Sequence, residues 1–176
     1  MDNTPLQLVR PAPELLNDYR DACRETWGHV HDSYILHDPA RFDEWKGRIF
    51  DDYRSQEAGI GLPEGRVPSA TFWLVRGSRY IGTINIRLRL NEALARYGGH
   101  VGVVVRLSER GKGYGTAALP LALSKARELG IADVLLTCTE DNAPSLAMLR
   151  SLPCKLEEHD RVMVDSALKS VVRFVF

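Results

Sequence analysis

Two segments between Glu14 and Tyr53 carry their apolar side chains at the spacing of helices. Between Glu14 and about Trp27 the apolar positions recur every three or four residues, at Leu15, Leu16, Tyr19, Cys23 and Trp27. Such a stripe predicts an amphipathic helix. A second helix is predicted from Pro39 through Tyr53, because proline suits a first turn and the apolar spacing continues through this segment.

Elsewhere in the chain, runs rich in β-branched and aromatic residues alternate with turns and helices. Strands are predicted at residues 6–10, 71–75, 80–90, 101–105, 134–138, 155–164 and 171–176. Further helices are predicted at residues 114–129, which Gly130 ends, and after Asn142, which suits an N-cap. The order predicts one mixed α/β domain spanning residues 1–176.

A glycine-rich segment joins the strand at 101–105 to the helix that follows. It contains Arg110, Gly111, Lys112, Gly113, Tyr114, Gly115 and Thr116. Successive glycines let consecutive backbone N–H groups converge, and the start of a helix favours an anion. Arg106, Arg110 and Lys112 add positive charge, so the segment suits a pyrophosphate.

Two nucleotide motifs do not fit this segment. A P-loop would need glycine at Arg106 and a hydroxyl residue at Gly113. A dinucleotide fingerprint would need glycine at Thr116 and an acid closing the next strand, whereas Asp133 opens it. A glycine-rich helix start without any ligand is the remaining alternative.

The chain resembles the GNAT superfamily of acyl-CoA-dependent N-acetyltransferases. Arg110, Gly113 and Gly115 fill the family's first motif, and Asn142 and Ser145 fill its second. The resemblance implies a central, mostly antiparallel, twisted sheet that is splayed at the CoA strand and flanked by helices. It also implies acetyl-CoA as cosubstrate and an acceptor that carries an amine.

The resemblance assigns residues to the cofactor. The loop from Arg110 to Thr116 would bind the pyrophosphate through backbone N–H groups. The strand residues Val103, Val104 and Val105 would pair with the pantetheine arm and polarise the thioester carbonyl. Asn142 and Ser145 would lie beside the pantetheine.

The catalytic groups are less defined. Many family members have a tyrosine, a proposed acid for the thiolate, where this chain has Leu149. Ser145, a water, or direct loss of the thiolate would serve instead. A protonated amine must also lose a proton, for which Glu140 and His100 are candidate bases. Because Leu149 lacks a hydroxyl, a CoA-binding regulatory or sensing module without catalysis is the alternative function.

The strand at 80–90 predicts an acceptor surface. Its alternation places Asn85, Arg87 and Arg89 on one face and the apolar residues on the other. Two arginines would suit a carboxylate or phosphate of the acceptor. An ordinary solvated sheet face with ion pairs is the alternative.

Composition excludes several classes of partner. Lys plus Arg and Asp plus Glu both number 23, so no overall field would attract nucleic acid or a membrane. Three cysteines at unrelated spacings argue against a disulfide framework and favour a cytoplasmic protein. His29 and His31 have no third ligand at a suitable spacing, so no metal site is predicted. A homodimer is compatible with these features.

Overall fold

The strands form two separate antiparallel sheets in a computed structural model that describes residues 4–29, 36–164 and 167–176. The first sheet has the order β1-β2-β3-β4 and contains β1 (Leu6–Val9), β2 (Ser69–Arg76), β3 (Arg79–Arg87) and β4 (Val101–Val105). The second has the order β5-β7-β6 and contains β5 (Leu135–Thr139), β6 (Leu156–Val164) and β7 (Ala167–Val175). Strands β4 and β5 are therefore both edge strands.

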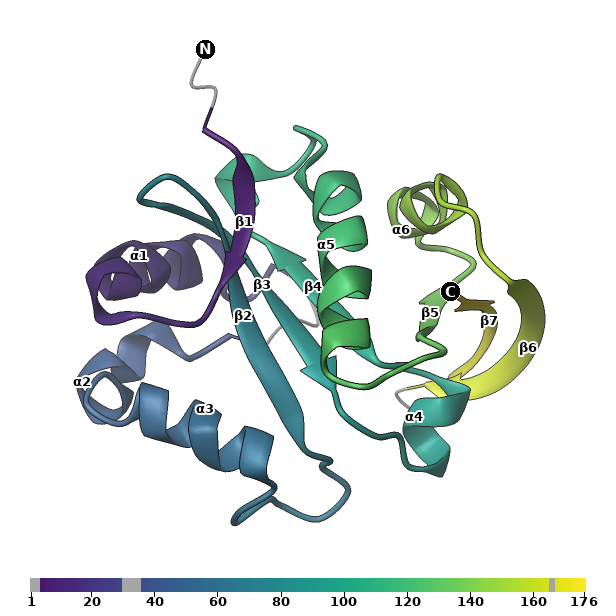
Figure 1. The fold of residues 1–176 in the computed structure, drawn as a ribbon, viewed down its shortest axis with the longest axis horizontal. Helices are drawn as coiled ribbons and strands as arrows, with labels where there is room; N and C mark the ends of the chain where they lie inside the picture. The colour runs from purple at the N-terminus through teal and green to yellow at the C-terminus, as the bar shows by residue number, and fades with distance from the viewer. Residues whose placement is uncertain (1–3, 30–35, 165–166) are drawn as a thin grey trace.

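Helices cover both faces of the first sheet, which is why β2 is buried along almost its whole length (Figure 1). On one face lie α1 (Leu16–Thr26), α2 (Phe42–Trp45) and α3 (Ile49–Ala58). On the other lies α5 (Tyr114–Glu128), and two shorter helices, α4 (Glu92–Arg96) and α6 (Ala143–Arg150), follow β3 and β5. Mixed α+β architecture is confirmed.

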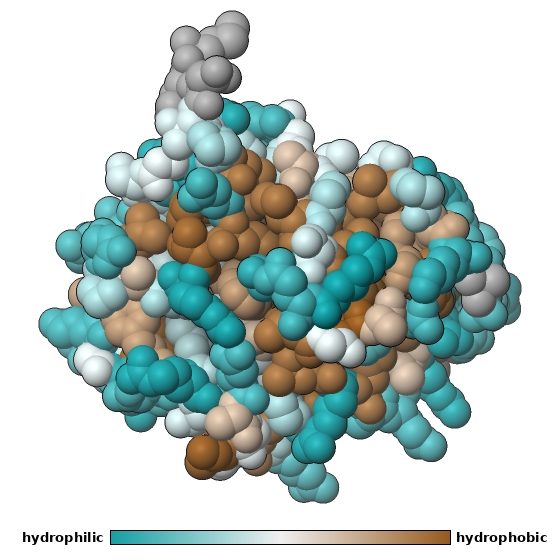
Figure 2. All heavy atoms as spheres, in the orientation of Figure 1, coloured by the Kyte–Doolittle hydropathy of each residue, from teal (hydrophilic) through white to brown (hydrophobic). Residues whose placement is uncertain are grey.

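Alternation along the strands separates two cores. Phe72, Leu74, Ile84 and Ile86 belong to the core under α5, as predicted for the apolar face of β3. Trp73 faces the other way and stacks on Tyr19 of α1, with ring centroids 4.6 Å apart. Figure 2 shows patches of apolar side chains toward the middle of the visible face, interspersed with polar side chains that also cover its margin.

Three predicted elements have different bounds in the structure. The predicted helix 39–53 is broken into a 3-10 turn (Pro39–Arg41), α2 and α3, and the last of these ends at Gly59, whose φ of 74° is left-handed. Strand β3 ends at Arg87, three residues early: the Leu88 amide still donates to Pro68 O, but Pro68 has no N–H to return the bond. Strand β7 begins at Ala167 rather than at residue 171.

The two sheets meet at the turn before β4. Gly99 lies so close to β5 that an added Cβ would be 2.4 Å from Leu135 O. The His100 amide donates to the same carbonyl oxygen at 2.7 Å. Beyond this contact no ladder joins β4 to β5 within the described strands. None of the described helices is long and apolar enough to cross a membrane.

Candidate active site

A cleft of about 1920 Å³ lies between the two sheets. Its walls are the edges of β4, from Val101 to Val105, and of β5, at Leu136, Thr137 and Thr139. The glycine-rich loop, α4, α6 and the β6–β7 hairpin also contribute to its lining. Val103, Val104 and Val105, which were assigned to the cofactor, all border this cleft.

The glycine-rich loop opens α5 as the sequence predicts. Gly111 and Gly113 have φ values of 74° and 80°, and an added Cβ at either would meet no atom within 4 Å. Gly113 is the N-cap residue, no side chain caps the helix there, and the first backbone bond runs from Ala117 N to Gly113 O. The first-turn N–H groups thus lie beside open space, which fits a phosphate group.

The charges around this loop differ from the prediction. Arg106 is buried and donates to Asp18 and Glu25 of α1, so its charge is not directed to the loop. Lys112 binds the buried carboxylate of Glu109 at 2.9 Å and does not line the cleft. Arg110 does line it, and its Nε donates to Val105 O at 3.0 Å. Backbone N–H groups, more than lysine charge, are therefore the candidate groups for binding an anion here.

The second motif lies at the start of α6, which also lines the cleft. The Asn142 side chain accepts a hydrogen bond from the Ser145 amide, which confirms the predicted N-cap of α6. Both residues line the cleft, as does Leu149, which is buried. Gly115 approaches this helix so closely that an added Cβ would be 3.1 Å from Met148 Sδ.

Several cleft residues were missed by the sequence analysis. They are Tyr97, Thr137, Thr139, Arg161, Met163, Leu168 and Lys169. The two threonines alternate with buried Leu136 and Cys138 along β5, and this polar alternation was a usable signal. The hairpin residues gave no local signal, because their place depends on how β6 and β7 pair.

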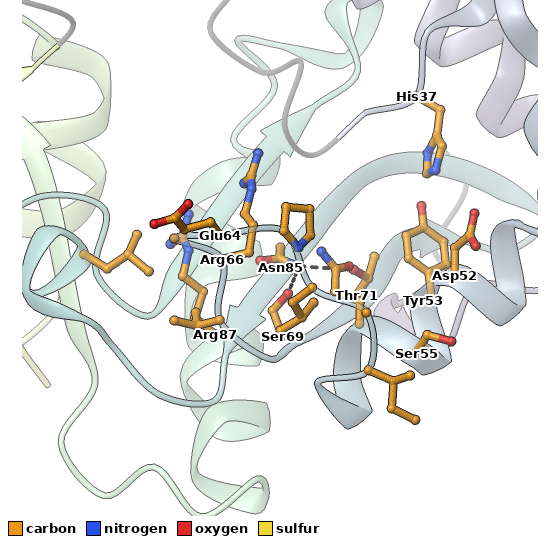
Figure 3. Close-up of a pocket in the computed structure, with 18 of the residues that line it drawn as sticks. His37, Asp52, Tyr53, Ser55, Glu64, Arg66, Ser69, Thr71, Asn85 and Arg87 are labelled. Carbon is orange, nitrogen blue, oxygen red and sulfur yellow. Dashed lines mark hydrogen bonds between the residues drawn. The ribbon is translucent and has the colours of Figure 1, made fainter.

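A second cavity, of about 560 Å³, lies on the α3 side of the first sheet. Figure 3 shows Ser69, Thr71 and Asn85 at its centre, where the Asn85 amide donates to both hydroxyls at 3.1 Å. Glu64, Arg66 and Arg87 lie at one end, and His37, Asp52 and Tyr53 lie at the other. Arg66, Arg87 and Leu94 also line the first cleft, so the two cavities meet there.

The predicted acceptor arginines lie in different environments. Arg87 is buried, and its Nη1 donates to Gly98 O at 2.9 Å and to Gly99 O at 2.8 Å. Arg89 lies beyond the end of β3, is exposed, and lines neither of the two cavities. Of the predicted set, the structure brings only Asn85 and Arg87 to the cavity.

The candidate bases are both engaged by other groups. His100 is half-buried at the meeting of the sheets, and its Nδ1 accepts from the Leu135 amide at 2.9 Å. Burial lowers the pKa of His100. Glu140 is exposed, binds His159 Nδ1 at 2.8 Å, and does not line the cleft. The pKa of His37, in the second cavity, is lowered to about 4 by burial.

No cluster of three or more metal-binding side chains occurs among residues 4–29, 36–164 and 167–176. His29 is exposed there, and His31 lies outside the described residues.

Comparison with known proteins identifies the family. The sequence matches the Acetyltransferase (GNAT) family over residues 12–152. No curated protein sequence is significantly similar to the chain.

Several solved structures share the fold. Mycobacterium smegmatis RimJ in complex with a CoA disulfide is 18% identical, with a TM-score of 0.70 over 97% of this chain and 81% of that one. RimL, a ribosomal L7/L12 α-N-protein acetyltransferase in complex with coenzyme A, is 14% identical, with a TM-score of 0.62 over 100% and 96%. YncA of Salmonella typhimurium with its cofactor acetyl-CoA is 12% identical, with a TM-score of 0.56 over 97% and 92%.

Proposed function

Because the chain belongs to the acetyltransferase (GNAT) family, we propose that it transfers an acetyl group from acetyl-CoA to a primary amine. The observation that carries the proposal is the meeting of two cavities. One cleft runs between the edges of β4 and β5 and has an anion-binding loop at its border. The other has a polar floor and shares Arg66, Arg87 and Leu94 with the first. Cofactor and acceptor would occupy one cavity each.

The cofactor fits the first cleft in shape and charge. The edge of β4 offers backbone groups to an extended pantetheine arm, as an added strand would use them. The first-turn amides of α5 would hold the pyrophosphate. Six basic and three acidic side chains line the cleft, which suits a polyanionic ligand. Acetyl-CoA would supply the activated acetyl group.

The acceptor amine would approach from the second cavity. Amines near the lysine pKa of about 10.4 must lose a proton before they attack. The positive charges of Arg66 and Arg87, where the cavities meet, would favour the neutral amine. The polar groups of Ser69, Thr71 and Asn85 would orient the rest of the acceptor.

No hydroxyl stands at Leu149 to protonate the departing thiolate. Ser145 lines the cleft nearby in sequence and is the protein's candidate donor. Direct departure of the thiolate is also chemically reasonable, because a thiol with a pKa of about 8.5 is acidic enough to leave as its anion. If the thiolate leaves unassisted, replacing Ser145 with Ala should lower kcat only slightly at high pH. If the serine donates a proton to the thiolate, the same substitution should lower kcat clearly.

The test is release of the CoA thiol from acetyl-CoA in the presence of a panel of primary amines. The panel should include free amino acids, polyamines and peptides with free N-termini. Amine-dependent thiol release, with a matching acetylated product by mass spectrometry, supports the proposal. Tight CoA binding without release across the panel would favour a regulatory or sensing module. Absence of CoA binding would reject both functions.

A further inference from the structure

One side chain takes part in the hydrogen bonds that join the two sheets. The His100 amide donates to Leu135 O at 2.7 Å, and the Leu135 amide donates back to His100 Nδ1 at 2.9 Å. In a regular ladder the second bond would be accepted by a backbone carbonyl. The His100 carbonyl instead accepts from the Arg87 amide on β3, at 2.7 Å. His100 thus links β3, through its carbonyl, to β5, through both its amide and its imidazole.

The contact is reinforced by its neighbours. Gly99 has a φ of 58° and approaches the Leu135 carbonyl more closely than a residue with a Cβ could. The Gly98 amide donates to Thr137 Oγ1 at 2.7 Å, and Arg87 Nη1 holds the carbonyls of Gly98 and Gly99. The turn from Gly98 to His100 is therefore fixed to both sheets.

Only the unprotonated Nδ1 can accept the Leu135 amide. The proton of the neutral ring must then be on Nε2. His100 is half-buried, and the charge of Arg87 also acts against a second proton. The hydrogen bond, the burial of the ring and the neighbouring cation all favour the neutral imidazole.

The position of this contact allows it to affect the width of the cleft. Val101, the first residue of β4, follows His100 directly, and Leu135 is the first residue of β5. The two strands therefore start from the contact and form opposite walls of the cleft farther on. The separation of those walls depends on how closely their starting points are held.

We propose that His100 is a positioning residue whose neutral imidazole holds the closed end of the cleft and so sets its width for the pantetheine arm. This inference rests on the proposed acetyl-CoA site. It assigns His100 a role different from that of a general base, because the nitrogen that faces Leu135 is already occupied.

Two substitutions separate the roles. In His100→Asn the side-chain oxygen stands where Nδ1 stands, one bond from Cγ, and can accept the Leu135 amide. His100→Ala removes the acceptor altogether. We expect His100→Ala to raise the Kd for CoA on the order of tenfold, or about 1.4 kcal/mol. His100→Asn should stay within about twofold of the wild type, because the acceptor is restored. The exposed His29, replaced by Asn, is the matched control.

The kinetic readout distinguishes a base from a positioning residue. A positioning role predicts that His100→Asn keeps its kcat and its pH profile, since the cleft keeps its shape. If His100 were a general base, both variants would keep the CoA affinity of the wild type, and both would have a lower kcat. Equal affinity of wild type and His100→Ala for CoA would overturn the inference, and so would failure of Asn to restore binding.

A measurement without CoA checks the contact itself. Long-range proton–nitrogen correlation spectra of the wild type should show His100 with the proton on Nε2 at neutral pH. A proton on Nδ1 would overturn the inference. The Leu135 amide should exchange with solvent faster in His100→Ala than in the wild type or His100→Asn. If the wild type binds no CoA, the proposed function fails; if it does and His100→Ala binds as tightly, this inference alone fails.

Discussion

At Gly113 the backbone conformation and the proposed ligand both favour a residue without a side chain. Its φ of 80° is left-handed, and the space where a side chain would point is open. We expect Gly113→Asp to abolish measurable CoA binding, because it places a negative charge where the pyrophosphate would lie. The backbone strain should cost about 1 kcal/mol of stability and leave the domain folded.

The matched control is Gly130→Asp. Gly130 follows α5, has a φ of 89° and also has no atom within 4 Å of an added Cβ, but it does not line the cleft. It therefore carries the same strain without the charge at the loop. Titration calorimetry with CoA, alongside thermal unfolding, should show similar stability for both variants and binding only for the control. Unchanged affinity in Gly113→Asp would reject the assigned loop.

Arg87 and Arg89 have the same charge and very different surroundings. Arg87 is buried and holds two backbone carbonyls of the turn before β4, whereas Arg89 is exposed. Replacing Arg87 with Ala leaves those carbonyls without this donor, so we expect a loss of about 1–3 kcal/mol of stability. Acceptor KM should rise on the order of tenfold, as expected for a charged contact worth about 1.4 kcal/mol.

Arg89→Ala is the comparison, and it should change neither stability nor acceptor KM appreciably. Steady-state kinetics with varied acceptor, at temperatures where both variants are fully folded, give the measurement. A larger effect from Arg89 than from Arg87 would place the acceptor elsewhere.

At the level of elements, an ion network around the buried Arg106 connects α1 to the segment that follows β4. Arg106 donates to Asp18 and Glu25, and the Asp18 carboxylate also accepts the Tyr80 amide at 2.7 Å. The hydrogen bond from Arg106 is the main reason that the pKa of Glu25 is lowered to about 2. This network fixes where the glycine-rich loop begins.

Replacing Glu25 with Gln should destabilise the fold at neutral pH by about 1–2 kcal/mol, allowing for the partial exposure of the carboxylate. The folded-state pKa lies below the ordinary value of about 4.3, so the contribution is complete above that pH and is lost toward about 2. Urea unfolding at pH 7 and pH 3 should therefore show a smaller difference between variant and wild type at the lower pH.

Glu44→Gln is the control for the network, because Glu44 makes an exposed ion pair with Arg41. Its effect on urea unfolding should be small at both pH values. If Glu25→Gln matched the wild type at pH 7, the network would not stabilise the fold.

Local sequence pattern predicts most elements but not how distant ones meet. The helical stripe of α1, the strand β4 and the cap at Asn142 follow from neighbouring residues, and the structure has them. Helix α4 was not predicted, because its residues Glu92–Arg96 carry no strong apolar period. Lys112 and Arg106 were counted as positive charge available to an anion, because their partners, Glu109 and the acids of α1, come together with them only in the fold.

At the scale of the whole molecule, CoA should stabilise the protein against heat. A ligand at about one hundred times its Kd adds about 2.7 kcal/mol to the free energy of unfolding. For a chain of this size each kcal/mol raises Tm by roughly 2–4 °C, so a rise of roughly 5–11 °C is expected. Thermal scans with ATP, which has phosphates but no pantetheine arm, give the control and should show a smaller rise.

The separation of β4 from β5 also has a consequence for the protein before any ligand arrives. Each is the edge strand of its own sheet, and such edges carry unpaired backbone groups that can recruit strands of other chains. CoA would cover these edges as a temporary strand. At low CoA concentration, newly synthesised protein would therefore be more prone to aggregate. Its solubility would depend on the concentration of CoA.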